Sequence, residues 1–419
     1  MEMTKYKLGD LCRIASSKRI FESEYVEKGV PFIRGQEISD GSILDPKASF
    51  ECYISQSRYE EIKEKYGKPT KGDILITAVG TIGNLCYLDK DIDFYFKDGN
   101  VIWFSEIISS CEGKFLFHFM KSSFFKDQLK YFMIGAVQKA LTIDMLKKVE
   151  VPLPPLSEQK KIASVLSALD DKIALNKKMN QKLEAMAKRL YDYWFVQYDF
   201  PDKNGHPYKT TGGPMTYNPT LKREIPAGWA DGVLSDIANI TMGQSPDGAS
   251  YNEDGEGMIF YQGSTDFGMR FPTVRQYTTA PTRFAKKGDI LMSIRAPVGA
   301  VNIANTDCCI GRGLSALNSK LGSLSHLYFL IDVFKKTFEN KNTVGTTFGS
   351  ITKDELYALP VVIPDKKVIE QFEKMAKPIF DRQMKLGEES NRLTKLRDKL
   401  LPLLMNGQVV VDDFKRGDN

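Results

Sequence analysis

The sequence predicts an α/β (α+β) protein in which two similar modules alternate with two long helices. Segments of the first half recur, in the same order, in the second half of the 419-residue chain. Within each repeat, short runs of β-type residues are separated by glycine-rich turns, which is typical of short strands. Each repeat then leads into apolar residues spaced alternately four and three apart, which is typical of a coiled-coil helix.

The repeat is clearest at a pentapeptide, because Lys-Gly-Asp-Ile-Leu occurs at residues 71–75 and again at 287–291. A single pentapeptide can recur by chance, whereas several matches in the same order indicate a duplicated module. The further matches pair 6–14 with 233–240, 31–39 with 259–267, and 135–154 with 345–364.

We expect the two modules at residues 1–156 and 232–364 and the two long helices at 157–198 and 365–419. The first module ends in a proline-rich segment, and proline interrupts a helix because it lacks an N–H donor and fixes φ. Residues 199–231 are rich in Gly, Pro, Thr and Asn, and this composition predicts a linker.

Both long helices have an apolar seam with a polar centre, so the two centres would meet if the helices paired antiparallel. Buried polar groups at such positions fix the register of a coiled coil at some loss of stability. Pro378 is expected to kink the second helix or to mark its start. The first seam is predicted at Ile162, Leu166, Leu169, Ile173, Leu183 and Leu190, with Asn176 and Asn180 at its centre. The second is predicted at Phe372, Met375, Ile379, Leu393, Leu396 and Leu400, with Arg382 and Glu389 at its centre.

An aromatic cluster closes the first long helix. Tyr191, Tyr193, Trp194 and Phe195 follow one another closely. Packing of the helix end against its neighbours is the favoured interpretation, and docking of a partner subunit is the alternative.

The composition limits the classes of protein that the chain could belong to. The chain is 42% hydrophobic and 26% charged, as ordinary globular proteins are. No apolar stretch approaches the roughly 20 residues of a membrane span, and the N-terminus lacks a secretory signal, so we expect a cytoplasmic protein without membrane contact. The net charge of +5 permits a polyanionic partner without requiring one.

Sequence motifs for catalysis and for metal binding are missing. There are three histidines, six scattered cysteines without C-x-x-C spacing, and no G-x-x-x-x-G-K-[ST] motif. The nearest approach to a motif of adenine methylation, Tyr217–Thr220, lacks its second proline and its aromatic residue. We therefore expect a non-catalytic chain that holds no metal and no cofactor, rather than a fused methyltransferase and nuclease.

Basic and amide side chains outside the predicted helices are the candidates for DNA contacts. Arg and Lys can read guanine in the major groove, and Asn and Gln can read adenine. For any one of these residues a solvated surface position is the alternative. Lys71 and Lys287 occupy the same place in both repeats, so support of a turn or contact with a phosphate is favoured for them. The candidates are Lys18, Arg19, Arg34, Gln36, Lys68 and Lys71 in the first module, and Gln244, Gln262, Ser264, Arg270, Arg275, Arg283, Lys287, Arg295 and Arg312 in the second.

Together these features resemble the specificity subunits of Type I restriction–modification systems. The resemblance covers almost the whole chain. Its motifs are the repeated Lys-Gly-Asp-Ile-Leu with its glycine turn, the proline-rich segment Val151–Leu156, and the helix beginning Ser157-Glu158-Gln159-Lys160-Lys161-Ile162-Ala163. The phrases Glu224–Trp229 and Asp398–Gly407 are also similar to that family. The second helix entry lacks the Pro-Leu-Ser-Glu-Gln form of the first, and Glu370-Gln371 is expected to be its displaced equivalent.

The resemblance implies two target-recognition domains in pseudo-twofold repeat, separated by two long antiparallel coiled-coil helices. Each domain would read one half of a bipartite, asymmetric double-stranded DNA site, and the helices would set the unread spacer. Two modification subunits would bring S-adenosylmethionine and adenine methylation, and restriction subunits would bring ATP, Mg and cleavage in defence against foreign DNA. The isolated chain would be prone to form a homodimer. A solitary modification system and a coiled-coil adaptor without DNA binding stay open as alternatives.

Overall fold

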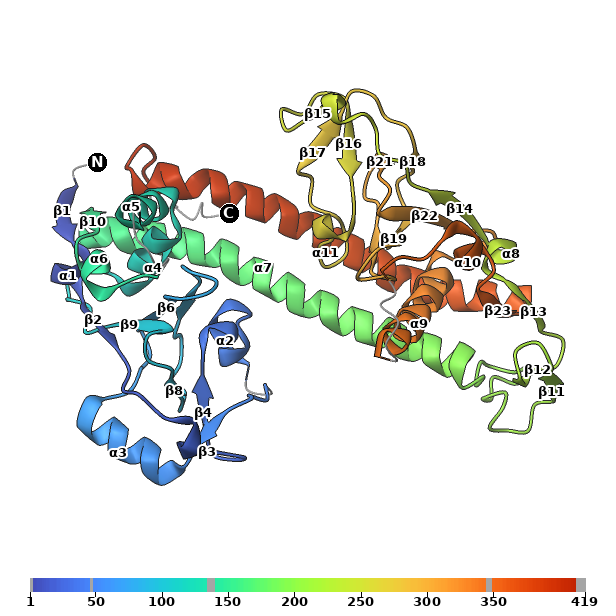
Figure 1. Ribbon diagram of the computed structural model, residues 1–419, viewed down its shortest axis with the longest axis horizontal. Helices are drawn as coiled ribbons and strands as arrows, with labels where there is room; N and C mark the ends of the chain where they lie inside the picture. The colour runs from blue at the N-terminus through green and yellow to red at the C-terminus, as the bar shows by residue number, and fades with distance from the viewer. Residues whose placement is uncertain (1–2, 46–47, 134–139, 344–348, 412–419) are drawn as a thin grey trace, which may run out of the picture. The chain divides into compact units, whose positions relative to one another are not determined.

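The computed structural model of the chain describes residues 3–45, 48–133, 140–343 and 349–411. The chain forms two compact units. Unit 1 consists of Met1–Ile173 and Arg392–Asn419, and unit 2 consists of Ala174–Asn391. Both long helices, α7 (Leu156–Tyr191) and α11 (Lys366–Met405), contribute residues to both units (Figure 1).

Strands in the described part of unit 1 form two four-stranded sheets and one two-stranded pair. The first sheet has the antiparallel order β2 (Arg13–Ser16), β9 (Val101–Ser105), β6 (Ile74–Thr77) and β7 (Leu85–Tyr87). The second has the order β3 (Tyr25–Val26), β5 (Tyr53–Ile54), β4 (Val30–Ile33) and β8 (Tyr95–Phe96), in which β4 and β8 run parallel.

Strand β6 lies between two hydrophobic cores, because successive side chains of a strand point to opposite faces. Ile74 and Ile76 pack into a core with the helices of unit 1, whereas Leu75 packs into a second core. Every residue of β6 and β9 is buried as a result, so neither strand shows the alternation of polar and apolar residues that a half-exposed strand would have.

Short helices and a strand pair complete unit 1. Strand β1 (Thr4–Lys7) pairs antiparallel with β10 (Glu150–Leu153), directly before α7 begins. Thr142 caps α6 by accepting a 3.2 Å hydrogen bond from the N–H of Met145. The helices of this unit before α7 are α1 (Leu8–Leu11), α2 (Gly35–Ser39), α3 (Gln56–Tyr66), α4 (Gly113–Lys121), α5 (Ser123–Met133) and α6 (Ile143–Lys147).

Unit 2 repeats this topology, which confirms the predicted duplication. Its first sheet has the order β14 (Ala238–Met242), β22 (Leu314–Ser319), β19 (Ile290–Ser293) and β20 (Val301–Ile303). Its second has the order β15 (Tyr251–Asn252), β17 (Gln276–Thr278), β16 (Met258–Tyr261), β21 (Cys308–Ile310) and β18 (Phe284–Ala285), with β16 and β21 parallel. Strand β18 extends this sheet beyond its counterpart in unit 1.

The second module also leads into its long helix as the first does. Strand β13 (Ala230–Val233) pairs with β23 (Pro360–Ile363) directly before α11, just as β1 pairs with β10 before α7. Because α11 begins at Lys366, Pro378 does not mark the start of this helix. When the two helix starts are aligned, Glu370-Gln371 lies two residues further along its helix than Glu158-Gln159 does. The other helices of unit 2 are α8 (Leu234–Ile237), α9 (Leu324–Thr343) and α10 (Lys353–Tyr357).

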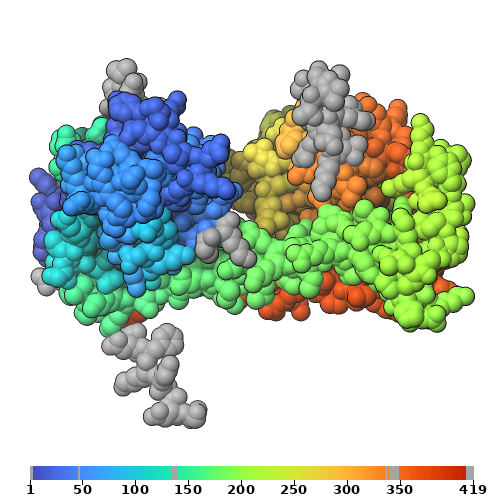
Figure 2. All heavy atoms as spheres, turned by 90° about the horizontal axis from the view of Figure 1, so that it is seen from below, coloured from blue at the N-terminus to red at the C-terminus, as the bar shows by residue number. Residues whose placement is uncertain are grey.

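Residues 199–231 differ from the linker that their composition predicts. Phe200 stacks on Trp229 with ring centroids 5.0 Å apart and on Tyr208 at 4.6 Å, and this stack belongs to the core of unit 2. A hairpin of β11 (Met215–Asn218) and β12 (Arg223–Pro226) follows. In Figure 2 the segment is the yellow-green part, and its atoms are packed together at the surface of unit 2. Burial of aromatic rings therefore orders a segment whose glycines and prolines suggest flexibility.

The aromatic cluster at the end of α7 packs as the favoured interpretation predicts. Tyr191, Trp194 and Phe195 are buried in the core of unit 2, while Tyr193 is 38% exposed. Three of the four residues lie in a π-helical turn, η3 (Asp192–Val196). None of the helices in the described part of the chain combines the length and the apolar character of a membrane span.

The two long helices pair antiparallel within each unit. In unit 2, Asn176 Nδ2 donates a 2.9 Å hydrogen bond to Glu389 Oε2, and Gln383 Nε2 donates to the carbonyl of Asn180 at 3.2 Å. In unit 1, Arg397 Nη1 lies 2.9 Å from Asp170 Oδ1. In unit 2, the later of the two α7 residues contacts the earlier of the two α11 residues, as antiparallel pairing requires.

The seam of α7 lies where the heptad pattern predicts it, but that of α11 deviates. Ile162, Leu166, Asn176 and Asn180 are buried, and Leu169, Ile173, Leu183 and Leu190 are half-buried. On α11, Phe372 is buried and Ile379, Leu393 and Leu400 are half-buried, but Leu396 is 46% and Met375 51% exposed, and Arg382 is also exposed. Ala376 and Gln383 are buried instead, because α11 packs against the second module as well as against α7.

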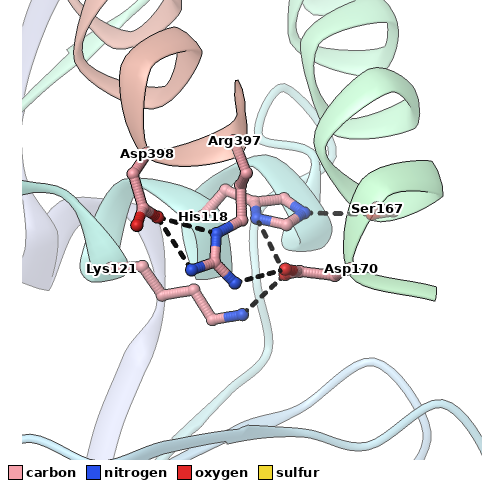
Figure 3. Close-up of polar contacts among 6 residues, drawn as sticks. All are labelled: His118, Lys121, Ser167, Asp170, Arg397 and Asp398. Carbon is pink, nitrogen blue, oxygen red and sulfur yellow. Dashed lines mark hydrogen bonds and ion pairs between the residues drawn. The ribbon is translucent and has the colours of Figure 1, made fainter. Parts of the chain in front are cut away.

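A charged cluster fastens the helix pair to the first module. In Figure 3, Asp170 of α7 points toward Lys121 of α4 at 2.8 Å and toward Arg397 of α11 at 2.9 Å. His118 of α4, which is 2% exposed, faces Ser167 Oγ at 3.0 Å and Asp170 at 3.9 Å. We call His118, Lys121, Asp170 and Arg397 the Asp170 cluster.

Candidate nucleic-acid interface

The candidate interface of unit 2 is a hollow of about 250 Å³ formed where several strands of both sheets end. Gln262–Asp266 follow β16, Arg295 and Ala296 follow β19, and Arg312 and Gly313 follow β21. Ser245 follows β14, and Arg275 directly precedes β17. The topology therefore collects five of the predicted contact residues at one place: Gln262, Ser264, Arg275, Arg295 and Arg312.

Backbone hydrogen bonds hold two of these loops against each other. Gly311 donates to the carbonyl of Tyr261 at 2.8 Å, and Gly313 donates to that of Gln262 at 3.2 Å. A Cβ on Gly313 would lie 2.6 Å from the oxygen of Gln262, so only glycine fits there without a shift of the loop. Arg312, between these glycines, donates its N–H to Ser245 Oγ at 3.3 Å. The backbone positions of Arg312 and Gln262 are thus fixed by hydrogen bonds between their loops.

The arginines of the hollow differ in their partners. Arg275 is paired with Asp266, a carboxylate that is only 7% exposed. Within the part of the chain that the structure describes, neither Arg295 nor Arg312 has an acidic partner, and both are exposed. The hollow therefore combines a surplus of positive charge with the amide of Gln262 and the hydroxyl of Ser264.

Gln244 and Arg283 lie at the border of this region. The backbone N–H of Gln244 donates to the carbonyl of Ile310 at 3.0 Å, and the N–H of Ile310 donates to the carbonyl of Arg283 at 2.9 Å. Both side chains are exposed. The structure thus places them on either side of the end of β21, next to Arg312.

Unit 1 builds the same frame from different side chains. Lys97 donates to the carbonyl of Ile33 at 2.9 Å, as Gly311 does to Tyr261. The next residues, Arg34 and Gln36, therefore correspond to Gln262 and Ser264 of unit 2. Gly35 lies close to Thr77: a Cβ added at this glycine would be 3.5 Å from the methyl group of Thr77.

Carboxylates and an aromatic ring accompany the basic residues of this first interface. Arg34 is paired with Glu51, and this hydrogen bond raises the pKa of Arg34. Arg19 lies 3.9 Å from Asp98, and Lys18 lies over the ring of Tyr66 at 4.7 Å. Gln36 is exposed and donates to Asp40 at 3.4 Å. The first interface is therefore closer to charge balance than the second.

Arg270 corrects the prediction of a DNA contact, because it is 4% exposed and lies inside unit 2. Its guanidinium stands 4.7 Å from the ring centre of Tyr328 and 4.9 Å from that of Phe380. It also donates to Gln383 at 2.6 Å and is paired with Glu184 of α7. Arg270 therefore fastens the second module to the helix pair and is not available to DNA.

Lysines at three predicted positions have structural contacts. Lys68 is paired with Asp93, which also accepts a 2.8 Å hydrogen bond from Tyr59; these two partners lower the pKa of Asp93. Lys71 and Lys287 both donate their backbone N–H to an aspartate, Asp91 or Asp307, at 2.8 Å. The backbone of each repeated lysine thus supports a turn in its unit. The side chains of both lysines are exposed and can contact a phosphate.

Several residues of the interface escape sequence reasoning. Asp266 and Asp98 set the charge beside the arginines, and Ser245 and Thr265 line the hollow of unit 2. Acidic and hydroxyl residues are too common to be singled out from sequence. Their positions depend on the register of the two parallel strand pairs, which the structure shows.

The described residues contain no cluster of three or more His, Cys, Asp or Glu side chains that could hold a metal ion. Burial lowers the pKa of His118 to about 4 and that of His326 to about 3, so both are neutral at neutral pH. Neither lies in the interfaces described above. The polar groups that the strands collect there are donors and acceptors suited to recognition of base edges and phosphates.

The chain thus combines two modules of one topology, each with a cluster of polar and basic loops, with a pair of long helices. Residues 1–185 and 226–398 match the family described as the Type I restriction modification DNA specificity domain, so the chain belongs to the specificity subunits of Type I restriction–modification systems.

Similar proteins agree with this assignment. A chain of Methanocaldococcus jannaschii, assigned to the type I restriction enzyme MjaX as its specificity subunit, is 30% identical over 391 residues, which are 91% of this chain and 88% of the relative. The MjaIX specificity subunit of the same organism is 27% identical over 98% of both chains. The crystal structure of an S subunit from M. genitalium shares the fold, with a TM-score of 0.59, 14% identity, and coverage of 98% of this chain and 97% of that one.

Proposed function

We propose that this chain reads a bipartite, asymmetric sequence in double-stranded DNA, one half with the loops of each unit, and directs adenine methylation and restriction by partner subunits. The observation that carries the proposal is that both units present corresponding loops with different side chains. Arg34-Gly35-Gln36 in unit 1 corresponds to Gln262-Gly263-Ser264 in unit 2. The two units share one arrangement of loops but present different hydrogen-bond donors and acceptors, and this suits the recognition of two half-sites of different sequence.

The chain itself acts as a recognition subunit without catalysis. Its sequence has neither a P-loop motif nor a complete motif of adenine methylation, and relatives are named as specificity subunits of restriction enzymes. Two modification subunits therefore supply S-adenosylmethionine and the methyl transfer, and restriction subunits supply ATP, Mg and cleavage. The lengths of α7 and α11 set the number of unread base pairs between the two half-sites. Without these partners the chain pairs with a second copy of itself.

Single-molecule sequencing of adenine methylation tests the proposal, in a host that carries this chain and a modification subunit of the same system. Methylation at one split, asymmetric motif is expected, and it should vanish when the gene for this chain is deleted. Methylation that persists after the deletion would contradict the proposal and favour the coiled-coil adaptor. Methylation that depends on the chain, in a strain without a restriction subunit, would favour the solitary modification system.

The same assay assigns each half-site to a unit. Gln36→Ala changes an exposed residue of the first interface, and Gln262→Ala changes the second. Each substitution should relax base preference in one half of the motif only, and the two substitutions should affect different halves. Relaxation of both halves by either substitution would rule out independent reading by the two units.

A further inference from the structure

We propose that Arg312 and Arg295 read guanine in the half-site bound by unit 2, an inference that rests on the proposed function of the chain. Both residues follow strands that end at the same hollow, Arg312 after β21 and Arg295 after β19. A guanidinium matches the O6 and N7 acceptors of guanine in the major groove with two parallel hydrogen bonds. The two arginines therefore select guanine, and not merely negative charge.

The first argument is charge. Three guanidinium groups line the hollow, from Arg275, Arg295 and Arg312, and Asp266 is the carboxylate among its described lining residues. Asp266 is paired with Arg275. No acidic side chain of the described residues is paired with the guanidinium of Arg295 or of Arg312. All N–H groups of these two side chains can therefore donate hydrogen bonds to DNA.

The second argument is rigidity. The backbone of Arg312 is held by its hydrogen bond to Ser245 and by the tight contact of Gly313 with Gln262. The carbonyl of Arg295 accepts a 2.7 Å hydrogen bond from Ser293 Oγ, and the residue forms a bridge with Ser350. A donor on a fixed stem loses less entropy on binding and discriminates between bases better than one on a mobile loop.

The third argument is the contrast with unit 1. Phe260 pairs with Cys309 in unit 2 as Phe32 pairs with Tyr95 in unit 1, so Arg312 corresponds to Asp98. Ile290 pairs with Leu317 as Ile74 pairs with Phe104, so Arg295 corresponds to Val79. An aspartate and a valine cannot donate hydrogen bonds to guanine. The two guanidinium groups therefore belong to unit 2 alone and distinguish the two half-sites.

Lysines on the rim provide a contrast within unit 2. Lys286 and Lys287 are exposed on the turn before β19, outside the hollow. An ammonium on a flexible stem suits a phosphate better than a particular base. Lys286→Ala is thus the matched control for the loss of one positive charge from the same unit.

The experiment compares the methylation motifs of the wild-type complex and of the variants Arg312→Ala, Arg295→Ala and Lys286→Ala. The wild-type motif should contain guanine in the half that Gln262→Ala affects. Each arginine variant should relax one guanine position to all four bases and leave the other positions unchanged. Lys286→Ala should lower methylation at all sites alike, without a change of motif.

Duplexes with 7-deazaguanine, which lacks the N7 acceptor, refine the test on the purified complex of this chain with its modification subunits. The wild-type complex should bind the modified half-site about tenfold more weakly than the guanine half-site. The complex that carries both Arg312→Ala and Arg295→Ala should bind the two duplexes equally. A unit 2 half-site without guanine, or arginine variants that lose methylation uniformly with an unchanged motif, would overturn the inference while methylation still depends on the chain. If methylation does not depend on the chain, the proposed function itself fails.

Discussion

Asn176 of α7 and Glu389 of α11 are joined by a 2.9 Å hydrogen bond, in which Asn176 Nδ2 donates to Glu389 Oε2. Both residues interrupt apolar seams, and the antiparallel pairing of the helices brings them together. Asn176 is 1% exposed, so its amide would lack a partner if the helices slipped by one heptad. The pair therefore favours one register of the two helices.

Substitution of this pair separates stability from register. Asn176→Leu leaves Glu389 facing an apolar side chain, and we expect it to lower the free energy of unfolding by about 1–3 kcal/mol. The double variant Asn176→Leu, Glu389→Leu should regain most of that loss, because two apolar residues suit a seam. Urea denaturation of the four proteins of this double-mutant cycle measures the coupling. Additive losses would show that the hydrogen bond does not couple the helices.

The Asp170 cluster should contribute more to stability than an exposed ion pair. Asp170→Asn leaves Lys121 and Arg397 without their shared carboxylate in a partly buried place, so we expect a loss of about 2–3 kcal/mol. The control is Asp127→Asn, which removes a carboxylate 2.9 Å from Lys130 where both side chains are well exposed. This control should lose under about 1 kcal/mol. Equal losses in urea denaturation would contradict a special role of the cluster.

Stability of unit 1 should fall as the pH is lowered from about 6.5 to about 4. Burial lowers the pKa of His118 to about 4, whereas an unfolded histidine titrates near 6.5. The unfolded chain binds a proton first in this window, so the stability that neutral His118 provides is present above pH 6.5 and is lost toward pH 4, by up to about 3 kcal/mol. Burial alone would raise the pKa of Asp170, but Lys121 and Arg397 lower it, so Asp170 adds to the loss only at lower pH.

Denaturation at several pH values checks this prediction. His118→Asn should reduce the pH dependence of the free energy of unfolding between pH 6.5 and 4. The slope that remains should come from His326, because burial lowers the pKa of that histidine as well. His206→Asn, at an exposed histidine, is the matched control and should leave the dependence as it is in the wild type. An unchanged slope in His118→Asn would show that this histidine is not the group that titrates.

Sequence reasoning succeeds here where a local pattern repeats. The two Lys-Gly-Asp-Ile-Leu segments lie at the start of corresponding strands, β6 and β19, and the heptads of α7 give its buried seam. Sequence reasoning fails where packing against a second element determines which residues of a helix are buried. Gln383, rather than Arg382, enters the seam of α11, because this helix is covered by α7 and by the second module together.

The contact residues show the same division. The repeat predicts that the two modules share one fold, and Gln262 and Arg312 are both predicted contact residues, but the pairing of β16 with β21 that brings them to one hollow comes from the structure. The burial of Arg270 does not follow from the repeat either, because it depends on Tyr328 and Phe380, which are distant from it in sequence. An arginine in a loop predicts a surface contact, whereas the aromatic rings that enclose this one are visible only in three dimensions.

Arg270 and Arg312 should therefore respond in opposite ways to the same substitution. Arg270→Ala removes a buried guanidinium from between two rings and leaves Glu184 without its cationic partner, so we expect a loss of about 3 kcal/mol in the free energy of unfolding and no change in the methylation motif. Arg312→Ala removes an exposed side chain and should change stability by less than about 0.5 kcal/mol. Urea denaturation and methylation sequencing of both variants decide the matter. A base preference that Arg270→Ala relaxes at unchanged stability would place this arginine at the DNA after all.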